Sequence, residues 1–174
     1  MTAAEEDLRQ SAELVCSTLR ERGETLSAAE SCTGGWFGRE ITRIPGASDV
    51  FWGSIVAYSD SAKTELAGIA PELIRDHGAV SREVAQALAA GIRQRSGTDW
   101  AVAITGVAGP AGGSPDKPIG TVWIGMSGPA GASVRCLAAT GDREDVRRSA
   151  VAAALQSLLE TVAATGVRGA GERG

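Results

Sequence analysis

The chain has 174 residues, of which 43% are hydrophobic, and its formal net charge at neutral pH is −4. This length and composition suit a single domain with a sizeable core, and the charge gives no basic footprint for nucleic acid. No apolar stretch is long enough to cross a membrane, and the acidic, polar start MTAAEEDLRQ is unlike a signal peptide. We therefore expect a cytoplasmic protein whose partners are neither nucleic acids nor membranes.

Cysteine and histidine usage narrows the possible chemistry further. Cys16, Cys32 and Cys136 are widely scattered, so they match neither a disulfide framework nor a zinc spacing. His77 is the single histidine, so any histidine-based catalytic triad depends on it alone. The sequence thus favours reduced thiols, no metal and no cofactor.

Apolar periodicity and turn residues predict alternating helices and strands in the first part of the chain. The predicted elements are, in order, a helix over 5–22, a strand over 25–29, a helix capped by Thr33 and ending near residue 43, a strand over 51–58, a helix with its N-cap in the cluster Ser59-Asp60-Ser61, a short helix over 71–75, a helix capped by Ser81 and ending near Gly97, and a strand over 99–105. The run 51–58 is apolar, β-branched and aromatic, which predicts a buried strand.

The later part of the chain has a different pattern. A glycine- and proline-rich loop over 106–118 precedes strands over 119–126 and 133–139, whose short join predicts an antiparallel hairpin. Asp142 is expected to cap a last helix ending near residue 164. The order of elements predicts an α/β layered domain with a mixed sheet over residues 1–165, followed by a disordered tail over 166–174.

One stretch, PGASDVFWGSIVAYSDSAK from Pro45 to Lys63, carries candidate catalytic groups. Ser48 lies on a turn, Tyr58 at the end of the predicted strand, and Lys63 in the first turn of the next helix, at position N3 if Asp60 is the cap. The positive end of the helix dipole and burial both favour neutral lysine, which can act as a general base for a serine nucleophile. The structural alternatives are a turn-capping serine, a tyrosine packed at a sheet edge, and a solvated helix lysine.

Two glycine-rich segments follow predicted strands. The segments AESCTGG (29–35) and TGVAGPAGGSPDKP (105–118) place small residues where ligands bind in open α/β sheets. Their backbone N–H groups are candidates for binding an anion or an oxyanion. The alternatives are a tight strand-to-helix turn and a flexible connector, although such connectors commonly span only about 2–6 residues.

Two further features concern anions and nucleophiles. Arg143, in GDREDVRR, is expected at the first position of the last helix, where a cation opposes the dipole, so it is a candidate phosphate ligand; neighbouring carboxylates and solvent are its alternative partners. Cys32 is a rival nucleophile, but it needs a cation to lower its pKa, and nothing in the sequence brings His77 near it.

Taken together, several motifs resemble one family along nearly the whole chain. They are AESCTGG, the IPGAS turn, YSDSAK, GAVS, TGVAGPAGGSPDKPIGTVW and GDREDVRR, and they occur in this order. The chain is identified by them as similar to the CinA C-terminal domain family. The resemblance implies a three-layer α/β/α sandwich, a homodimer or higher homo-oligomer, and deamidation of nicotinamide mononucleotide in pyridine-nucleotide salvage. The absence of the family's usual N-terminal domain favours a free-standing enzyme.

The resemblance also implies roles for individual residues. Ser48 corresponds to the catalytic serine, Lys63 to the lysine and Tyr58 to the tyrosine. The substrate-binding positions are Glu30, Ser31, Thr33, Gly34, Thr105, Gly106 and Arg143. The implied oxyanion donors are backbone N–H groups at Thr33–Gly34 or Thr105–Gly106.

Two other functions remain open at this point. The first is a non-catalytic nucleotide-binding or regulatory module linked to competence or DNA damage. The second is a different amide or nucleotide hydrolase that uses Cys32. Intact Ser48, Tyr58 and Lys63 argue against the first of these, whereas thiol alkylation that abolishes activity, with Ser48→Ala active, would favour the second.

Overall fold

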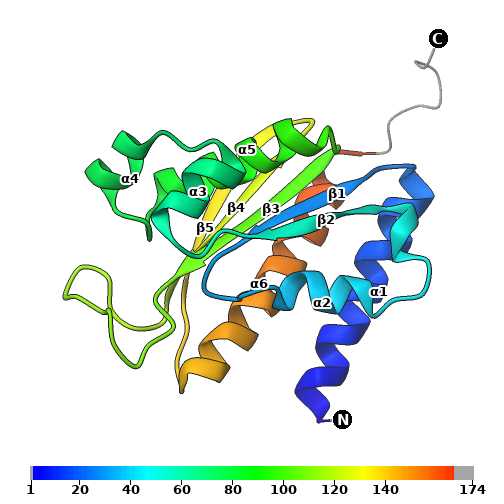
Figure 1. Cartoon of the computed structure of the whole chain (residues 1–174). Helices are drawn as coiled ribbons and strands as arrows, with labels where there is room; N and C mark the ends of the chain where they lie inside the picture. Colours follow the sequence, from blue (N-terminus) through cyan, green and yellow to red (C-terminus); the bar gives the residue numbers. More distant parts are fainter. Residues whose placement is uncertain (1, 167–174) are drawn as a thin grey trace.

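The computed structural model describes residues 2–166, and in it helices flank both faces of one five-stranded sheet (Figure 1). The strands are β1 (Leu26–Glu30), β2 (Phe51–Val56), β3 (Trp100–Gly106), β4 (Thr121–Gly128) and β5 (Gly131–Ala138). The helices are α1 (Ala3–Arg22), α2 (Trp36–Thr42), α3 (Asp60–Ala67), α4 (Pro71–His77), α5 (Arg82–Ser96) and α6 (Arg143–Ala164), with a 3-10 turn, η1 (Ala47–Asp49), before β2.

The sheet is mixed, with strand order β2-β1-β3-β4-β5. β1 pairs in parallel with both β2 and β3, whereas β3–β4 and β4–β5 are antiparallel. The carboxyl ends of β1, β2 and β3 therefore lie at the same edge of the sheet. This arrangement confirms the predicted mixed sheet and late hairpin.

Two hydrophobic cores hold the layers together. One lies between the sheet and α1, α2 and α6, and includes Leu19, Phe37, Trp100 and Leu155. The other lies between the opposite face of the sheet and α3, α4 and α5, and includes Leu88. The three-layer α/β/α sandwich is thereby confirmed.

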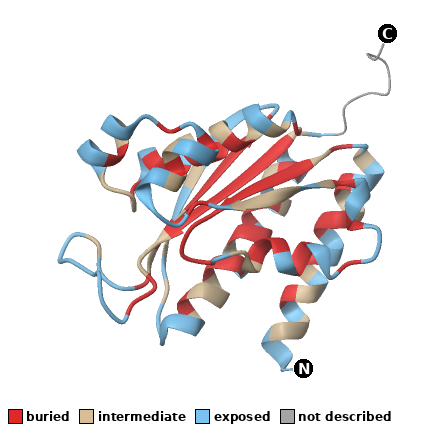
Figure 2. Ribbon diagram, in the orientation of Figure 1, coloured by how far each residue is buried: buried red, intermediate tan, exposed pale blue. Residues whose placement is uncertain are grey.

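The prediction of a buried strand after Pro45 is wrong for this chain. β2 is an edge strand, and Figure 2 draws it mainly as partly buried while β1 and β3 are buried. Trp52 and Val56 are 56% and 45% exposed. Composition favours a strand here, but it does not distinguish a central strand from an edge strand, because both are rich in β-branched and aromatic residues.

Local capping differs from prediction at α2, and at α3 the structure selects one residue of the predicted cluster. α2 begins with Gly35 at its N-cap, and no side chain of the cap residue bonds there, so Thr33 does not cap it. Ser59, the first residue of the predicted capping cluster, caps α3, with its hydroxyl accepting from the Ala62 N–H. Lys63 therefore lies at the fourth helical position, one residue beyond the predicted N3, where the dipole acts more weakly.

The remaining predicted caps are confirmed. Ser81 caps α5, and Asp142 caps α6 in a capping box with Asp145. Apart from Gly166, the predicted disordered tail (166–174) lies outside the described residues. Among the helices that the structure describes, none has the length and apolarity to cross a membrane.

Candidate active site

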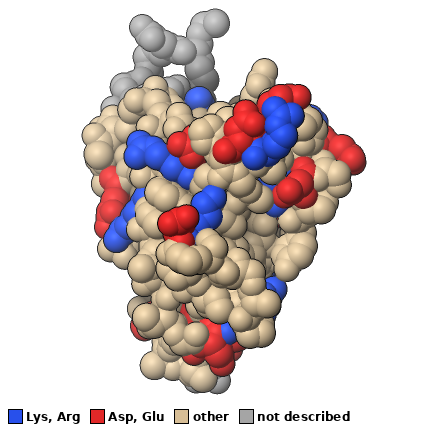
Figure 3. Space-filling model, turned by 90° about the vertical axis from the view of Figure 1, so that its left-hand side faces the viewer, with Lys and Arg blue, Asp and Glu red and all other residues tan. Residues whose placement is uncertain are grey.

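The predicted site residues gather mainly at the carboxyl ends of β1, β2 and β3, on the left-hand side of Figure 1. The loop after β3 and the N-terminus of α6 lie at the same end. This is the edge at which open α/β sheets bind ligands. Figure 3 views this end of the molecule, where acidic and basic side chains of the described residues are interspersed.

Lys63 is almost completely buried, with its side chain only 2% exposed. Its Nζ donates a hydrogen bond of 2.9 Å to the carbonyl oxygen of Tyr58, and Asp60 Oδ1 lies 3.8 Å away. Burial lowers the pKa of the Lys63 ammonium below its ordinary value of 10.5, although the exposed carboxylate of Asp60 opposes this shift. The fold thus favours the neutral amine that a general base requires.

Tyr58 and Arg143 meet although 85 positions separate them in the chain. Arg143 donates from Nη2 to the Tyr58 hydroxyl at 3.3 Å and from Nη1 to the Gly109 carbonyl at 2.6 Å. The start of α6 therefore contacts both the end of β2 and the loop after β3. A guanidinium has five N–H donors, more than these two contacts use, so Arg143 retains the chemistry of a phosphate ligand.

Glu30 is fully buried, and its carboxylate organises the turn between β1 and α2. Oε2 accepts from Thr33 Oγ1 at 2.7 Å and from the N–H groups of Gly35 and Phe37 at 3.0 Å. Oε1 accepts at 2.8 Å from the Gly38 N–H and from Ser54 Oγ. Five hydrogen bonds are about what two carboxylate oxygens accept, so Glu30 acts here as the cap that Thr33 was expected to supply.

The turn that Glu30 holds contains three of the predicted binding residues. Ser31 and Thr33 are buried, whereas Gly34 is exposed and has a positive φ of 61°. The Gly34 N–H donates to the Ser31 carbonyl at 3.1 Å. This bond engages one of the two amides that were expected to act as oxyanion donors at this turn.

Thr105 and Gly106, at the end of β3, serve packing in this chain. The buried Thr105 hydroxyl donates to the Ala79 carbonyl at 2.8 Å, which ties the strand to the segment before α5. A Cβ at Gly106 would lie 2.7 Å from Val122 Cγ2 and 2.8 Å from the Thr121 carbonyl oxygen. Both residues therefore shape the edge of the site, and glycine is needed at 106 for the close approach of β4.

Sequence reasoning missed Arg147, which lies one turn beyond Arg143 on α6. Arg147 donates from Nε to the Cys32 carbonyl at 3.2 Å and from Nη2 to the Thr33 carbonyl at 2.8 Å. Its guanidinium also stacks over Trp36, 5.2 Å from the ring centroid. The i, i+4 spacing from Arg143 was the signal that could have identified it.

The rival nucleophile is poorly suited to its role. Cys32 is buried, and burial raises the pKa of its thiol to about 11, so the thiolate is scarce at neutral pH. His77 is the last residue of α4, which extends two residues beyond the predicted helix over 71–75, and its Nδ1 faces Glu83 at 3.6 Å. Among the described residues, no group of three or more His, Cys, Asp or Glu side chains is arranged to hold a metal ion.

Ser48 is the one predicted catalytic residue that this chain does not bring to the site. It lies on η1, before β2 begins, whereas Lys63 follows the other end of that strand. The six residues of β2 extend roughly 20 Å. Arg20 braces the Ser48 turn by donating to the Gly46 carbonyl at 2.9 Å and pairing with Asp49 at 3.5 Å.

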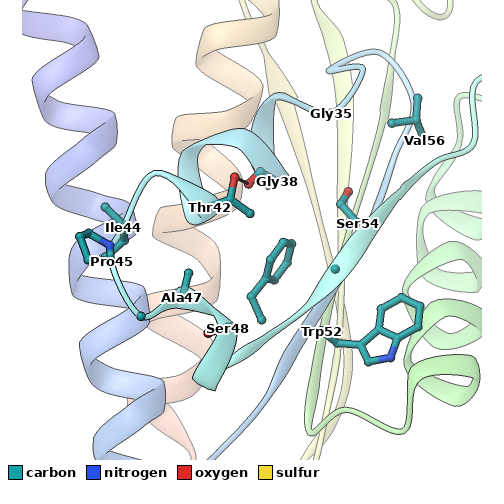
Figure 4. A pocket seen from close by; sticks show the side chains of 13 residues that line it. Gly35, Gly38, Thr42, Ile44, Pro45, Ala47, Ser48, Trp52, Ser54 and Val56 are labelled. Carbon is teal, nitrogen blue, oxygen red and sulfur yellow. Dashed lines mark hydrogen bonds between the residues drawn. The ribbon is translucent and has the colours of Figure 1, made fainter.

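Ser48 instead lines one end of a groove of about 680 Å³ between α2 and β2. Figure 4 shows Ser48 near the start of β2 and Val56 at the opposite end. The other lining residues are mostly small or apolar, and none is charged: Gly35, Gly38, Thr42, Ile44, Pro45, Gly46, Ala47, Phe51, Trp52, Gly53 and Ser54. Such a groove suits apolar groups better than a phosphate.

Comparison with known proteins gives a consistent family match. The model of the CinA C-terminal domain matches residues 8–162. A CinA-like protein of Synechocystis is 52% identical over 132 residues, which are 76% of this chain and 32% of that protein. A CinA-like protein of Anaeromyxobacter is 48% identical over 146 residues, covering 84% and 36%. The chain thus spans about a third of the length of these curated relatives.

Solved structures resemble the chain over most of its length. The competence/damage inducible protein CihA of Agrobacterium tumefaciens has a TM-score of 0.85 and 35% identity, over 88% of this chain and 94% of its own. A CinA superfamily protein of Klebsiella pneumoniae has a TM-score of 0.87 and 33% identity, over 90% and 98%.

Proposed function

The chain belongs to the CinA C-terminal domain family, and from that membership we propose that it is an amidohydrolase of carboxamide nucleotides, with nicotinamide mononucleotide as substrate. The observation that supports this proposal best is the environment of Lys63. This lysine is almost completely buried, and burial lowers the pKa of its ammonium group. Perturbed titratable groups at the carboxyl edge of parallel strands are typical of catalytic sites.

In the proposed reaction, Ser48 Oγ attacks the carboxamide carbon after its proton passes to a neutral Lys63. Because Ser48 and Lys63 flank opposite ends of β2 within one chain, this lysine is proposed to come from another copy in the homo-oligomer that the family resemblance implies. The tetrahedral intermediate collapses as the C–N bond breaks, and ammonia leaves with a proton from Lys63 or Tyr58. Water then hydrolyses the acyl-enzyme, which yields nicotinate mononucleotide and free Ser48. The scheme uses no cofactor.

Substrate binding is assigned to the groups around the strand ends. Arg143 and the glycine-rich loop after β3 are proposed to bind the phosphate, because guanidinium pairs with phosphate in bidentate fashion. Phosphate contacts remote from the reacting carbon supply binding energy that orients the amide. Nicotinamide mononucleotide should therefore be a much better substrate than the riboside.

The test is ammonia release from a panel of nicotinamide mononucleotide, its riboside and free nicotinamide. We expect release from the nucleotide, and a loss of roughly three orders of magnitude or more in Ser48→Ala and in Lys63→Ala, with little further loss in the double variant. Near-normal turnover by Ser48→Ala would show that Ser48 is not the nucleophile. Equal kcat/KM for nucleotide and riboside would remove Arg143 from a phosphate site.

The second candidate is a nucleotide-binding or regulatory module without catalysis, linked to competence or DNA damage. The separation of Ser48 from Lys63 within one chain is the observation that favours it. Nicotinamide mononucleotide that binds to the protein in calorimetry, with no ammonia released from any member of the panel, would support this candidate over the amidohydrolase.

A further inference from the structure

We propose that Arg147 is a positioning residue of the active site, which fixes the backbone of the turn over residues 31–34 in the conformation that the substrate needs. This inference rests on the proposed function, because the family resemblance assigns substrate-binding positions to this turn. It adds a role for an arginine that is not among the predicted site residues, and that role is exerted through the turn rather than through contact with the substrate.

The first two turns of α6 contact the segments that follow all three parallel strands. Arg143 reaches the Tyr58 hydroxyl after β2 and the Gly109 carbonyl after β3. Arg147 lies four positions later, on the same face of the helix, and reaches two carbonyls of the turn after β1. The start of α6 therefore sets the position of this turn relative to the proposed phosphate ligand.

The guanidinium of Arg147 is held in one orientation. Its Nε and Nη2 donate to consecutive carbonyls, those of Cys32 at 3.2 Å and Thr33 at 2.8 Å. Its Nη1 donates to Glu144 at 2.8 Å, and its plane lies over the ring of Trp36, 5.2 Å from the centroid. A lysine cannot reproduce these contacts, because an ammonium group lacks the planar fork that binds two carbonyls side by side.

Arg147 and Glu30 hold opposite sides of the same turn. The Glu30 carboxylate accepts from three N–H groups at the start of α2, whereas Arg147 donates to carbonyl groups. Because a peptide unit is planar, fixing its carbonyl also fixes the direction of its N–H group. The carbonyls of Cys32 and Thr33 thus determine where the N–H groups of Thr33 and Gly34 point, and these amides are one of the two pairs implied as oxyanion donors.

A direct role in phosphate binding fits Arg147 less well than Arg143. Nε, Nη1 and Nη2 of Arg147 each already donate to a protein oxygen, and the Glu144 carboxylate at 2.8 Å balances its charge. In the part of the chain that the structure describes, no carboxylate pairs with Arg143, so the charge of Arg143 is available to an anion. Arg143 is therefore the better phosphate ligand, and Arg147 acts through the turn.

The first experiment separates positioning from phosphate binding. Arg147→Ala should lower kcat/KM by about 100-fold on nicotinamide mononucleotide and by the same factor on its riboside, since a displaced turn affects both substrates. Arg143→Ala should instead reduce the preference for the nucleotide. Arg148→Ala is the matched control and should keep the wild-type kcat/KM, because Arg148 lies 6.0 Å over the same aromatic ring but pairs with Asp145. Unchanged kinetics in Arg147→Ala, or a loss confined to the nucleotide, would overturn the inference.

Arg147→Lys tests the planar fork and keeps the positive charge. We expect a loss of at least about tenfold in kcat/KM on both substrates, with an unchanged circular dichroism spectrum. This variant also serves if Arg147→Ala does not fold. A lysine variant as active as the wild type would show that the two-carbonyl contact is dispensable, which contradicts the proposal.

The last experiment does not depend on activity. Amide hydrogen exchange followed by NMR should be at least about tenfold faster at Gly34 in Arg147→Ala than in the wild type, and unchanged there in Arg148→Ala. The amides of the central strand β3 serve as the reference for global unfolding. An equal acceleration at Gly34 and in β3 would show a general loss of stability and would refute a positioning role. If the wild type releases no ammonia, the proposed function fails, while this exchange pattern still decides whether Arg147 holds the turn.

Discussion

Replacing Glu30 with glutamine should destabilise the fold, because the Glu30 carboxylate is buried and holds the turn between β1 and α2. The carboxylate accepts five hydrogen bonds, three of them from N–H groups at the start of α2. Glutamine places an NH₂ group at one of the two oxygen positions, where it faces donors. If it replaces Oε1, Ser54 can rotate to accept, but the Gly38 N–H loses its partner.

The size of the effect follows from these contacts. At least one charge-assisted hydrogen bond is lost, which is worth about 1.5–3 kcal/mol, and a buried N–H is left without a partner. The remaining hydrogen bonds are no longer charge-assisted, and the favourable interaction between the carboxylate charge and the α2 dipole is lost. We expect the free energy of unfolding to fall by roughly 3 kcal/mol.

Urea unfolding followed by circular dichroism measures this change. Glu21→Gln is the control, because Glu21 is exposed and its replacement should change stability by less than about 0.5 kcal/mol. An unfolding midpoint equal to that of the wild type would refute the capping role. Unchanged stability with a raised KM would instead make Glu30 a substrate-binding residue, as the family resemblance implies.

Three further predictions test the site. Because burial lowers the pKa of Lys63, activity should rise with pH along an acidic limb with a midpoint below 10.5, and Lys63→Arg should be inactive at every pH because guanidinium keeps its proton. Because the pKa of Lys63 is lower in the folded than in the unfolded chain, the free energy of unfolding should decrease as pH falls from the unfolded to the folded pKa of Lys63. In Lys63→Met, urea unfolding should no longer show this pH dependence. Since the pKa of Cys32 is about 11, iodoacetamide at neutral pH should label the exposed Cys136 first, and Cys32→Ala should remain active; loss of activity on labelling Cys32, with Ser48→Ala active, would point to a cysteine hydrolase. Arg147→Ala should lower the free energy of unfolding by about 1–3 kcal/mol, because the carbonyls of the buried residues Cys32 and Thr33 lose their donor. Arg148→Ala, whose ion pair with Asp145 is half-exposed, should cost less than about 1 kcal/mol in the same urea assay.

Elements defined by local signals were predicted well. Asp142, followed three residues later by Asp145, and Ser81 before a periodic run both start helices where expected, because a cap depends on residues within one turn. Thr33 failed as a cap for a non-local reason. Its position was right for capping, but a buried carboxylate three residues earlier takes the same N–H groups and also binds Ser54 on β2.

Contacts between distant parts of the chain were beyond local reasoning. The bond between Arg143 and Tyr58 depends on how the sheet order places the start of α6 next to the end of β2. Arg147 was overlooked because its partners are the backbone carbonyls of residues 32 and 33. Every residue has a backbone carbonyl, so the sequence does not indicate which ones accept a hydrogen bond from a distant arginine.

The placement of Ser48 shows why nearness in sequence misleads. Fifteen positions separate it from Lys63, but six of them form an extended strand, which carries the chain away from its start at about 3.3 Å per residue. The same strand was predicted to be buried, and in a single chain Trp52 and Val56 are exposed. Both differences have one cause: composition and spacing identify a strand, but not its place at the edge of the sheet or how far it carries the chain.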